Sequence, residues 1–289
     1  MQLSTLECQA SVNSSIQYLN LKDGLWHECL EDSYGFLRES WQENWLGMPV
    51  VLNECLRFLN LHEHNCSEDT KSMLSAAKSV ALEIENQSEI RPKGAEPKYH
   101  NRLHFADALT SMSVQLAILV QLEKKSNQDW IACALLTCIA HDFVHPGQIN
   151  LVESEIEKQS VDFLKPILAL HRVTDEWQKV IEIAILRSDF AIVHHNHADV
   201  AGKRFEWNLK WLCVLLNESD VMASASSKFG PALGESLAQE WQLIDFPLHA
   251  SVASNEGRKS FLKQLSFSSP ASLVLGLCER IAGEIQSIK

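Results

Sequence analysis

The sequence predicts an all-α protein, and three observations support this expectation. The chain of 289 residues contains 11 glycines and 8 prolines. Together these are roughly 7% of the residues where average usage gives about 12%, so turns are few and helices are joined by short loops. Apolar residues recur at helical spacing along most of the chain. No convincing run of alternating β-branched residues occurs, so a sheet is not expected.

Composition and charge exclude two classes of protein. A hydrophobic content of 46% with 21% charged residues rules out a disordered chain. The net charge is −12, and no cluster of lysine and arginine is longer than two residues. A phosphate backbone needs a basic surface, so a nucleic-acid polymer is not an expected partner. A small phosphorylated substrate is still possible, because a bound metal ion can reverse the charge of one pocket.

The cysteines and the hydropathy pattern predict a reduced, cytoplasmic protein that is not inserted in a membrane. The 8 cysteines form no Cys-x-x-Cys pair, and most lie in apolar helical patterns, as buried thiols do. The N-terminal residues have neither the basic nor the apolar region of a signal peptide. The longest apolar runs, such as Trp130 to Ala140, are too short to span a bilayer.

The strongest break in the chain lies between Ser88 and Lys98, where the sequence SEIRPKGAEPK contains two prolines and a glycine. It divides the chain into an N-terminal helical subdomain, residues 1–90, and a second domain, residues 91–289. The first part is rich in tryptophan and leucine. Its Trp26, Trp41 and Trp45 are expected in the core or at the interface of a possible homodimer.

The first helix after the break is expected from Tyr99 to Glu123. Steps of four and three residues place five polar side chains on one stripe of this helix, which is otherwise apolar. The polar members of the stripe are His100, His104, Asp107, Ser111 and Gln115. Such a stripe is expected to face either solvent or a polar cavity.

The second and third helices bring carboxylates into the interior. The helix expected from Gln128 to Phe143 is apolar on all sides, so it is buried, and it ends in His141 and Asp142. Burying a carboxylate costs several kcal/mol unless it is paired or bound to a metal. The helix expected from Arg204 to Met222 is also apolar, and Asp220 lies near its end.

These residues have the composition of a catalytic metal site. Imidazole and carboxylate groups together suit Zn, Mn, Fe and Mg. A site of two histidines and two aspartates leaves coordination positions open for water, as catalytic sites do. The candidates are His100, His104, His141, Asp142, His145 and Asp220.

Two segments resemble the signatures of the class I cyclic nucleotide phosphodiesterases, a family within the all-α HD-type metal phosphohydrolases. Residues 99–107 read YHNRLHFAD and look like the family's Y-H-N-x-x-H-A-x-D. Residues 141–150 read HDFVHPGQIN and are similar to H-D-x-x-H-P-G-x-x-N. The resemblance covers about residues 95–275. It implies a compact multi-helix catalytic domain in the second part of the chain.

The resemblance implies roles for the residues of these motifs. His104, His141, Asp142 and Asp220 would bind the tighter metal ion, usually zinc, and Asp142 would bridge to a second ion, magnesium or manganese. His100 would be the general acid, which protonates the leaving oxygen. His145 would lie beside the second metal.

Further matches imply residues that bind the substrate or hold the metal ligands in place. Gln264, Leu265, Ser266 and Phe267 are similar to a Q-x-G-F segment. There the glutamine hydrogen-bonds the purine and the phenylalanine stacks on it, and Asn150 is expected beside the substrate as well. Three further residues are expected around the ligands. Glu157 ends a segment that resembles a weakened S-V-L-E, and Asp189 ends a segment that is similar to I-L-A-T-D. The third, Asp107, belongs to the polar stripe.

The chain departs from the family pattern in ways that leave the base preference open. The segment between Asp142 and Glu157 is short, which is more typical of a bacterial than of an animal member. Where the family has E-N-H-H, residues Glu157 to Ser160 read EKQS, so both histidines of the motif are absent. Ala223 replaces an asparagine that contacts the base, and Ser266 replaces the glycine of the Q-x-G-F segment.

Three functions are compatible with these residues. The leading expectation is hydrolysis of a 3′,5′-cyclic nucleotide, cAMP or cGMP, by a metal-dependent enzyme. The same fold and metals could instead serve another phosphoester or a di-iron oxygenase. The third alternative is a non-catalytic protein that senses a ligand or binds a partner.

Overall fold

The part of the chain that the computed structural model describes, residues 16–62, 66–91, 96–242 and 246–288, is built from helices. None of these residues forms a strand, so the all-α prediction is confirmed. The described helices are α2 (Trp26–Ser40), α3 (Met48–Phe58), α4 (Glu68–Ile90), α5 (Arg102–Glu123), α6 (Gln128–Ala140), α7 (Glu155–Leu170), α8 (Asp175–Leu186), α9 (Val193–Val200), α10 (Leu209–Ala225), α11 (Gly230–Trp241), α12 (Phe246–Val252), α13 (Asn255–Gln264), α14 (Pro270–Val274) and α15 (Leu277–Ser287).

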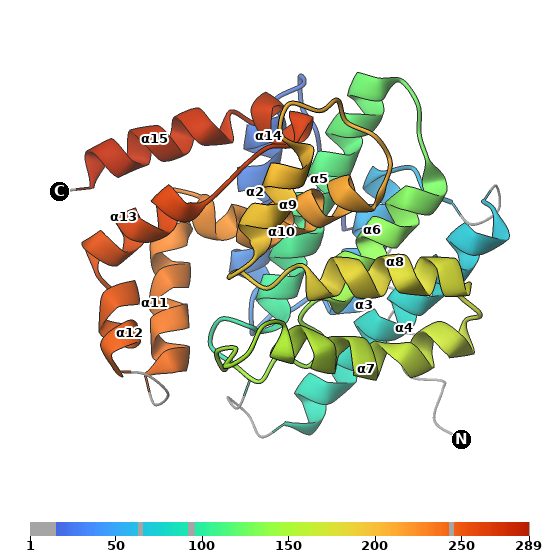
Figure 1. The fold of residues 1–289 in the computed structure, drawn as a ribbon, viewed down its shortest axis with the longest axis horizontal. Coiled ribbons are helices and arrows are strands. Elements are labelled where there is room, and N and C mark those ends of the chain that lie inside the picture. Colours follow the sequence, from blue (N-terminus) through green and yellow to red (C-terminus); the bar gives the residue numbers. More distant parts are fainter. Residues whose placement is uncertain (1–15, 63–65, 92–95, 243–245, 289) are drawn as a thin grey trace.

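Helix α5 runs through the middle of the molecule and contacts α2, α3, α6, α10 and α14 (Figure 1). Helices α7 and α8 pack together on one side of it. Helices α11, α12 and α13 follow one another on the other side (Figure 1). This arrangement places the start of α5 and the ends of α6 and α10 between the two peripheral groups.

Asparagine side chains fix where the three central helices begin. Asn101 accepts hydrogen bonds from the amides of Leu103 and His104 at the start of α5. Asn127 accepts a hydrogen bond from the Trp130 amide at the start of α6, and Asn208 accepts one from the Trp211 amide at the start of α10. An asparagine at this position satisfies amides that the first turn leaves unpaired. Helices α5 and α10 therefore begin a few residues later than predicted.

The end of α6 also differs from the expected boundary. The helix ends at Ala140 rather than at residue 143, and His141 is its C-terminal cap residue. The chain then runs through turns and loop without a regular helix until α7 begins at Glu155. His141 and Asp142 consequently lie at the point where a buried helix opens into a loop, both still shielded from solvent.

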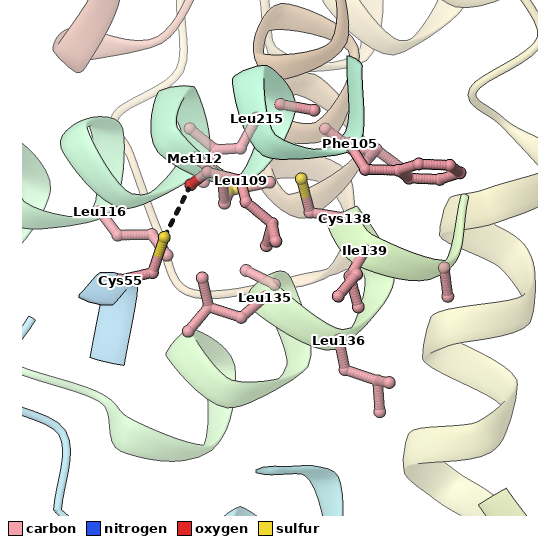
Figure 2. Close-up of a cluster of buried hydrophobic side chains, with 14 of the residues drawn as sticks. Cys55, Phe105, Leu109, Met112, Leu116, Leu135, Leu136, Cys138, Ile139 and Leu215 are labelled. Atoms are coloured by element: carbon pink, nitrogen blue, oxygen red, sulfur yellow. Dashed lines mark hydrogen bonds between the residues drawn. The ribbon is translucent and has the colours of Figure 1, made fainter. Parts of the chain in front are cut away.

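One hydrophobic core extends across the predicted boundary near residue 90. Its buried side chains run from Tyr18 to Ile281 along the chain. Figure 2 shows its centre, where leucines of α5 and α6 interdigitate and the Cys55 thiol donates to the Leu109 carbonyl at 3.7 Å. The N-terminal helices thus share their core with the helices that carry the candidate ligands.

Asp107, Ser111 and Gln115 of the polar stripe on α5 are buried and make hydrogen bonds inside the protein, so this part of the stripe does not face solvent. Ser111 hydrogen-bonds the Tyr34 hydroxyl at 2.6 Å. Gln115 donates to the Ser219 hydroxyl at 2.7 Å. Through these hydrogen bonds Ser111 and Gln115 join α5 to α2 and α10.

Most of the described cysteines and the most apolar helix are buried inside the fold. The described cysteines are free thiols, and five of these seven are buried; Cys8 lies outside the described residues. Among the described helices, α5 alone is long and apolar enough to cross a bilayer, and 89% of its apolar window is buried within the fold. This degree of burial is typical of a helix in the core of a protein.

Candidate functional site

Four predicted ligands meet where three helices come together. His104 lies in the first turn of α5, His141 and Asp142 follow α6, and Asp220 belongs to α10. The His104 Nε2 atom is 3.3 Å from Asp142 Oδ2 and 3.2 Å from Asp220 Oδ1. The His141 Nε2 atom is 3.3 Å and 3.5 Å from the same two oxygens. Two nitrogens and two oxygens therefore surround one point.

The two imidazole nitrogens that face this point are buried and have no hydrogen-bond partner. Both Nε2 atoms are shielded from solvent, and the carboxylate oxygens lie close to them without the alignment of a hydrogen bond. The other nitrogen of His141, Nδ1, bonds the Cys138 carbonyl at 2.7 Å, so it carries the ring proton. The Nε2 atom of His141 is thereby directed at the two carboxylates. A histidine held in this way is typical of a metal ligand.

The spacing and chemistry of the four atoms fit a divalent metal ion. Zinc binds imidazole nitrogen and carboxylate oxygen at about 2.0–2.2 Å, so neighbouring ligands in a tetrahedron lie about 3.4 Å apart. The observed separations of 3.2–3.5 Å match this value. A cation would also satisfy the two orphaned nitrogens. This buried His/Asp group could therefore bind a metal ion.

The electrostatics of the cluster favour a positive charge. Burial lowers the pKa of His104, but the Asp142 and Asp220 carboxylates outweigh burial and raise it to about 9. The same carboxylates raise the pKa of His141 well above its ordinary value, again against the effect of burial. Burial raises the pKa of both carboxyls, yet the neighbouring imidazoles outweigh it and hold both pKa values below their ordinary range. Without a metal ion, protons supply the charge that the carboxylates require.

His100 forms a pair with a glutamate that the sequence analysis missed. Its Nδ1 atom lies 2.5 Å from the Oε1 atom of Glu240, in the last turn of α11. The other carboxylate oxygen accepts from the backbone amides of Tyr99 and His100, at 2.7 Å and 3.0 Å. Burial raises the pKa of Glu240, but the hydrogen bond from His100 outweighs it and lowers the pKa. An ionised Glu240 therefore holds the proton of His100 on Nδ1 and leaves Nε2 for the cavity.

His145 stacks on His100 and is kept neutral. The two rings lie 3.6 Å apart at an angle of 21°. Burial, followed by the charge of His100, lowers the pKa of His145 to about 3. Its Nδ1 atom accepts from the Gly147 amide at 3.1 Å, so the ring proton is on Nε2. His100, His145 and Glu240 also lie close enough to hold an ion, but the Nδ1 atoms of both histidines are already hydrogen-bonded, to Glu240 and to the Gly147 amide.

A cavity of about 520 Å³ opens in front of both groups. One end is lined by His100, His141, Asp142, His145 and Asp220. The opposite walls come from α7, α11, α13 and the segment between α8 and α9, and they are mostly apolar. A volume of this size with a polar end is typical of a small-molecule site.

The predicted substrate residues lie in different surroundings. Gln264 lines the cavity. Phe267 does not: its ring is 8% exposed and belongs to the hydrophobic core, where it cannot stack on a ligand in the cavity. Asn150 lines the cavity, but its amide donates to Glu157 at 2.9 Å and accepts from the Ile156 amide at 2.8 Å. Both ends of the Asn150 side chain are thus used within the protein.

Glu157 and Asp189 both line the cavity. Burial raises the pKa of Glu157 to about 7, against the hydrogen bond from Asn150. Asp189 accepts from the backbone amides of Ser154 and Ala191, at 2.8 Å and 2.9 Å. Its carboxylate therefore joins the loop before α7 to the segment between α8 and α9.

Asp107 is paired with a residue of the N-terminal helices. Its two oxygens accept from the Arg38 guanidinium at 2.9 Å and 2.8 Å. The aspartate is 2% exposed, so this is a buried bidentate ion pair. It lies one turn along α5 from His104 and links that turn to α2.

Comparison with models of known protein families and with curated proteins finds no match to this chain. The resemblance to the cyclic nucleotide phosphodiesterases therefore rests on the motifs of this sequence alone.

Proposed function

We propose that this protein is a metal-dependent phosphohydrolase that cleaves a phosphodiester, with a 3′,5′-cyclic nucleotide as the substrate. The observation that carries the proposal is the pair of orphaned His104 and His141 nitrogens, which face two carboxylates at the polar end of the cavity. The hydrogen-bonded His100 and Glu240 beside that cluster supply a proton donor at the same end.

His104, His141, Asp142 and Asp220 would hold one divalent ion, with zinc the best fit to two imidazoles and two carboxylates. Asp142 would also help to hold a second ion, magnesium or manganese. When bound, such ions neutralise a phosphodiester and lower the pKa of water from about 15.7 toward 7, which produces a nucleophile at neutral pH.

His100 would give the proton to the leaving oxygen. Its Nδ1 proton is held by Glu240, so the Nε2 atom is the one that delivers a proton into the cavity. The Glu240 carboxylate fixes the orientation of the His100 ring, and the neutral ring of His145 stacks on its face. Proton transfer by a positioned histidine contributes about 10²–10⁴-fold to a rate.

A cyclic nucleotide fits the division of the cavity into a polar and an apolar end. The phosphodiester would lie at the histidines and aspartates, and the base would lie against the apolar walls near Gln264. A glutamine amide offers both a donor and an acceptor to the edge of a base.

The test combines metal content with turnover. Purified protein loaded with zinc and magnesium should hydrolyse cAMP or cGMP to the 5′-monophosphate, and His100→Ala should lose turnover while retaining its metal. His195→Ala, which changes an exposed histidine outside the cavity, is the matched control. Failure to hydrolyse either nucleotide or a simple phosphodiester would refute the proposal, and two irons per chain would favour the oxygenase.

A further inference from the structure

A second cavity, of about 370 Å³, shares no lining residue with the cavity in front of the ligand cluster. Its walls come from the start of α2, the C-terminal end of α10 with the two serines that follow it, and α15. A volume of this size lies within the range that small ligands occupy. The proposed reaction uses none of the residues that line it, so the cavity needs an explanation of its own.

His27 lines this cavity, and neither nitrogen of its ring has a hydrogen-bond partner among the described residues. The Nδ1 atom is shielded from solvent. A buried N–H group without an acceptor is rare in proteins, so the ring proton is expected on Nε2. Burial, followed by the charge of Arg280, lowers the pKa of His27, against the charges of Glu31 and Glu28. The neutral ring therefore has an N–H donor that nothing in the described chain uses.

Arg280 and Glu31 bring one charge of each sign to the same cavity. Within the described part of the chain, neither side chain forms an ion pair. Arg280 donates through Nε to the Leu275 carbonyl at 3.3 Å, which leaves both of its terminal nitrogens for a ligand. Glu31 lies one turn after His27 on α2, so the two side chains share one face of the helix. Both charges act on the pKa of His27, so both lie near its ring.

Apolar side chains from all three helices complete the wall. The largest of them are buried: Leu30, Met222, Leu277 and Ile281. Gly283 also lines the cavity, and a Cβ atom added there would meet no other atom within 4 Å. A ligand that matches this wall has an apolar part and, next to it, groups of both charges.

We propose that this cavity binds a free α-amino acid with an apolar side chain. The α-carboxylate accepts from the Arg280 guanidinium and from the His27 Nε2–H group, and the α-ammonium group donates to the Glu31 carboxylate. Guanidinium and carboxylate groups form strong, charge-assisted hydrogen bonds. A simple anion would be repelled by Glu31 and a simple cation by Arg280, whereas a zwitterion satisfies both.

Calorimetry on the full chain tests the site, with L-leucine, L-methionine and L-phenylalanine as the probes. Gly283→Leu should abolish binding, since its side chain occupies the cavity and its Cβ atom clashes with nothing. Ala282→Leu is the matched control, because Ala282 is exposed on the same helix and does not line the cavity. Arg280→Gln should weaken binding by about 10-fold, through loss of a hydrogen bond between charged groups.

Two analogues of phenylalanine test whether both charges are needed. Phenylpropionate lacks the ammonium group and phenethylamine lacks the carboxylate, so each should bind about 10-fold more weakly than L-phenylalanine. In Glu31→Gln the preference for L-phenylalanine over phenylpropionate should disappear, because the partner of the ammonium group has lost its charge.

The inference is overturned if none of the three amino acids binds the wild-type protein with a Kd below about 10 mM. It is also overturned if Gly283→Leu binds them as tightly as Ala282→Leu does. Equal affinity of the wild-type protein for L-phenylalanine and phenylpropionate would overturn the assignment to a zwitterion. These measurements read binding and not turnover, so their outcome is independent of the proposed hydrolysis.

Discussion

The Arg38–Asp107 ion pair makes a prediction that does not depend on the reaction. Replacing Arg38 by methionine keeps much of the apolar volume but leaves the Asp107 carboxylate, which is 2% exposed, without its guanidinium. Both oxygens lose a hydrogen bond, and the arginine also leaves its position 4.4 Å from the centre of the Phe229 ring.

The loss can be estimated from the geometry. Removing one partner of a buried pair costs about 3–5 kcal/mol, since the remaining charge stays buried. At about 2 °C per kcal/mol for a chain of this size, Tm should fall by about 6–10 °C. Burial raises the pKa of Asp107 even with Arg38 present. A carboxyl with a raised native pKa loses stability as the pH rises toward that pKa, so the deficit should be larger at pH 8 than at pH 5.

Thermal unfolding at both pH values measures this effect. Arg187→Met is the matched control, because the Arg187–Asp199 pair is 37% and 38% exposed and contributes about 0–1 kcal/mol. Adding Asp107→Asn to Arg38→Met should recover part of the loss. Zinc content should stay the same in all variants, because Asp107 is not a ligand. An Arg38→Met variant as stable as Arg187→Met at pH 8 would refute the reasoning.

Three other predictions concern the cavity. Zinc at 100 times its Kd should stabilise the wild-type protein by about 2.7 kcal/mol, seen as a higher Tm that chelation reverses, and Asp220→Asn should remove most of this shift; an equal shift in the variant contradicts the ligand set. Glu240→Gln should keep its metal, measured by elemental analysis, but lower kcat by about 10-fold to 100-fold, since a hydrogen bond to a charged group contributes about 1.5–3 kcal/mol; loss of the metal would place Glu240 among the ligands instead. The pKa of Glu157 is raised to about 7, so the wild-type protein loses stability as the pH rises from 4.5 to 7. Unfolding in urea should therefore show Glu157→Gln to be more stable than the wild-type protein at pH 8 but not at pH 4. The difference at pH 8 should be about 1–2 kcal/mol, because the carboxyl is partly solvated. Equal stabilities at pH 8 would show that ionisation of Glu157 does not destabilise the fold.

The local sequence pattern predicted the helices and brought out the four residues of the buried His/Asp group that could bind a metal ion. Helix α6 is apolar on all sides, so His141 and Asp142 had to be buried, and a buried carboxylate requires a cation or a pair. Asp220 was expected near the end of the third helix; it lies inside α10, which runs on to Ala225, and its side chain is 24% exposed. These predictions rest on the spacing of apolar residues along each helix. That spacing decides which face of the helix is buried, so it can be read without knowing the tertiary structure.

Residues defined by long-range contacts could not be predicted. Glu240 pairs with His100 across 140 residues, and Arg38 pairs with Asp107 across 69. No spacing rule joins positions so far apart, and α11 offers only an acid in an amphipathic helix as a signal. Phe267 is a different case: a motif match suggested contact with the substrate, but its ring packs in the hydrophobic core, a placement that the motif alone does not reveal.

The position of His141 at the end of α6 has one further consequence. The carbonyl of Cys138 that accepts from its Nδ1 atom is one that a helix C-terminus leaves unpaired. Aligned peptide dipoles give this end of a helix a partial negative charge of about half an electron. A cation held by His141 and Asp142 would sit at that pole, so the backbone of a wholly apolar helix would itself contribute to metal affinity. Shortening or kinking α6 should weaken metal binding even if all four ligands are left intact.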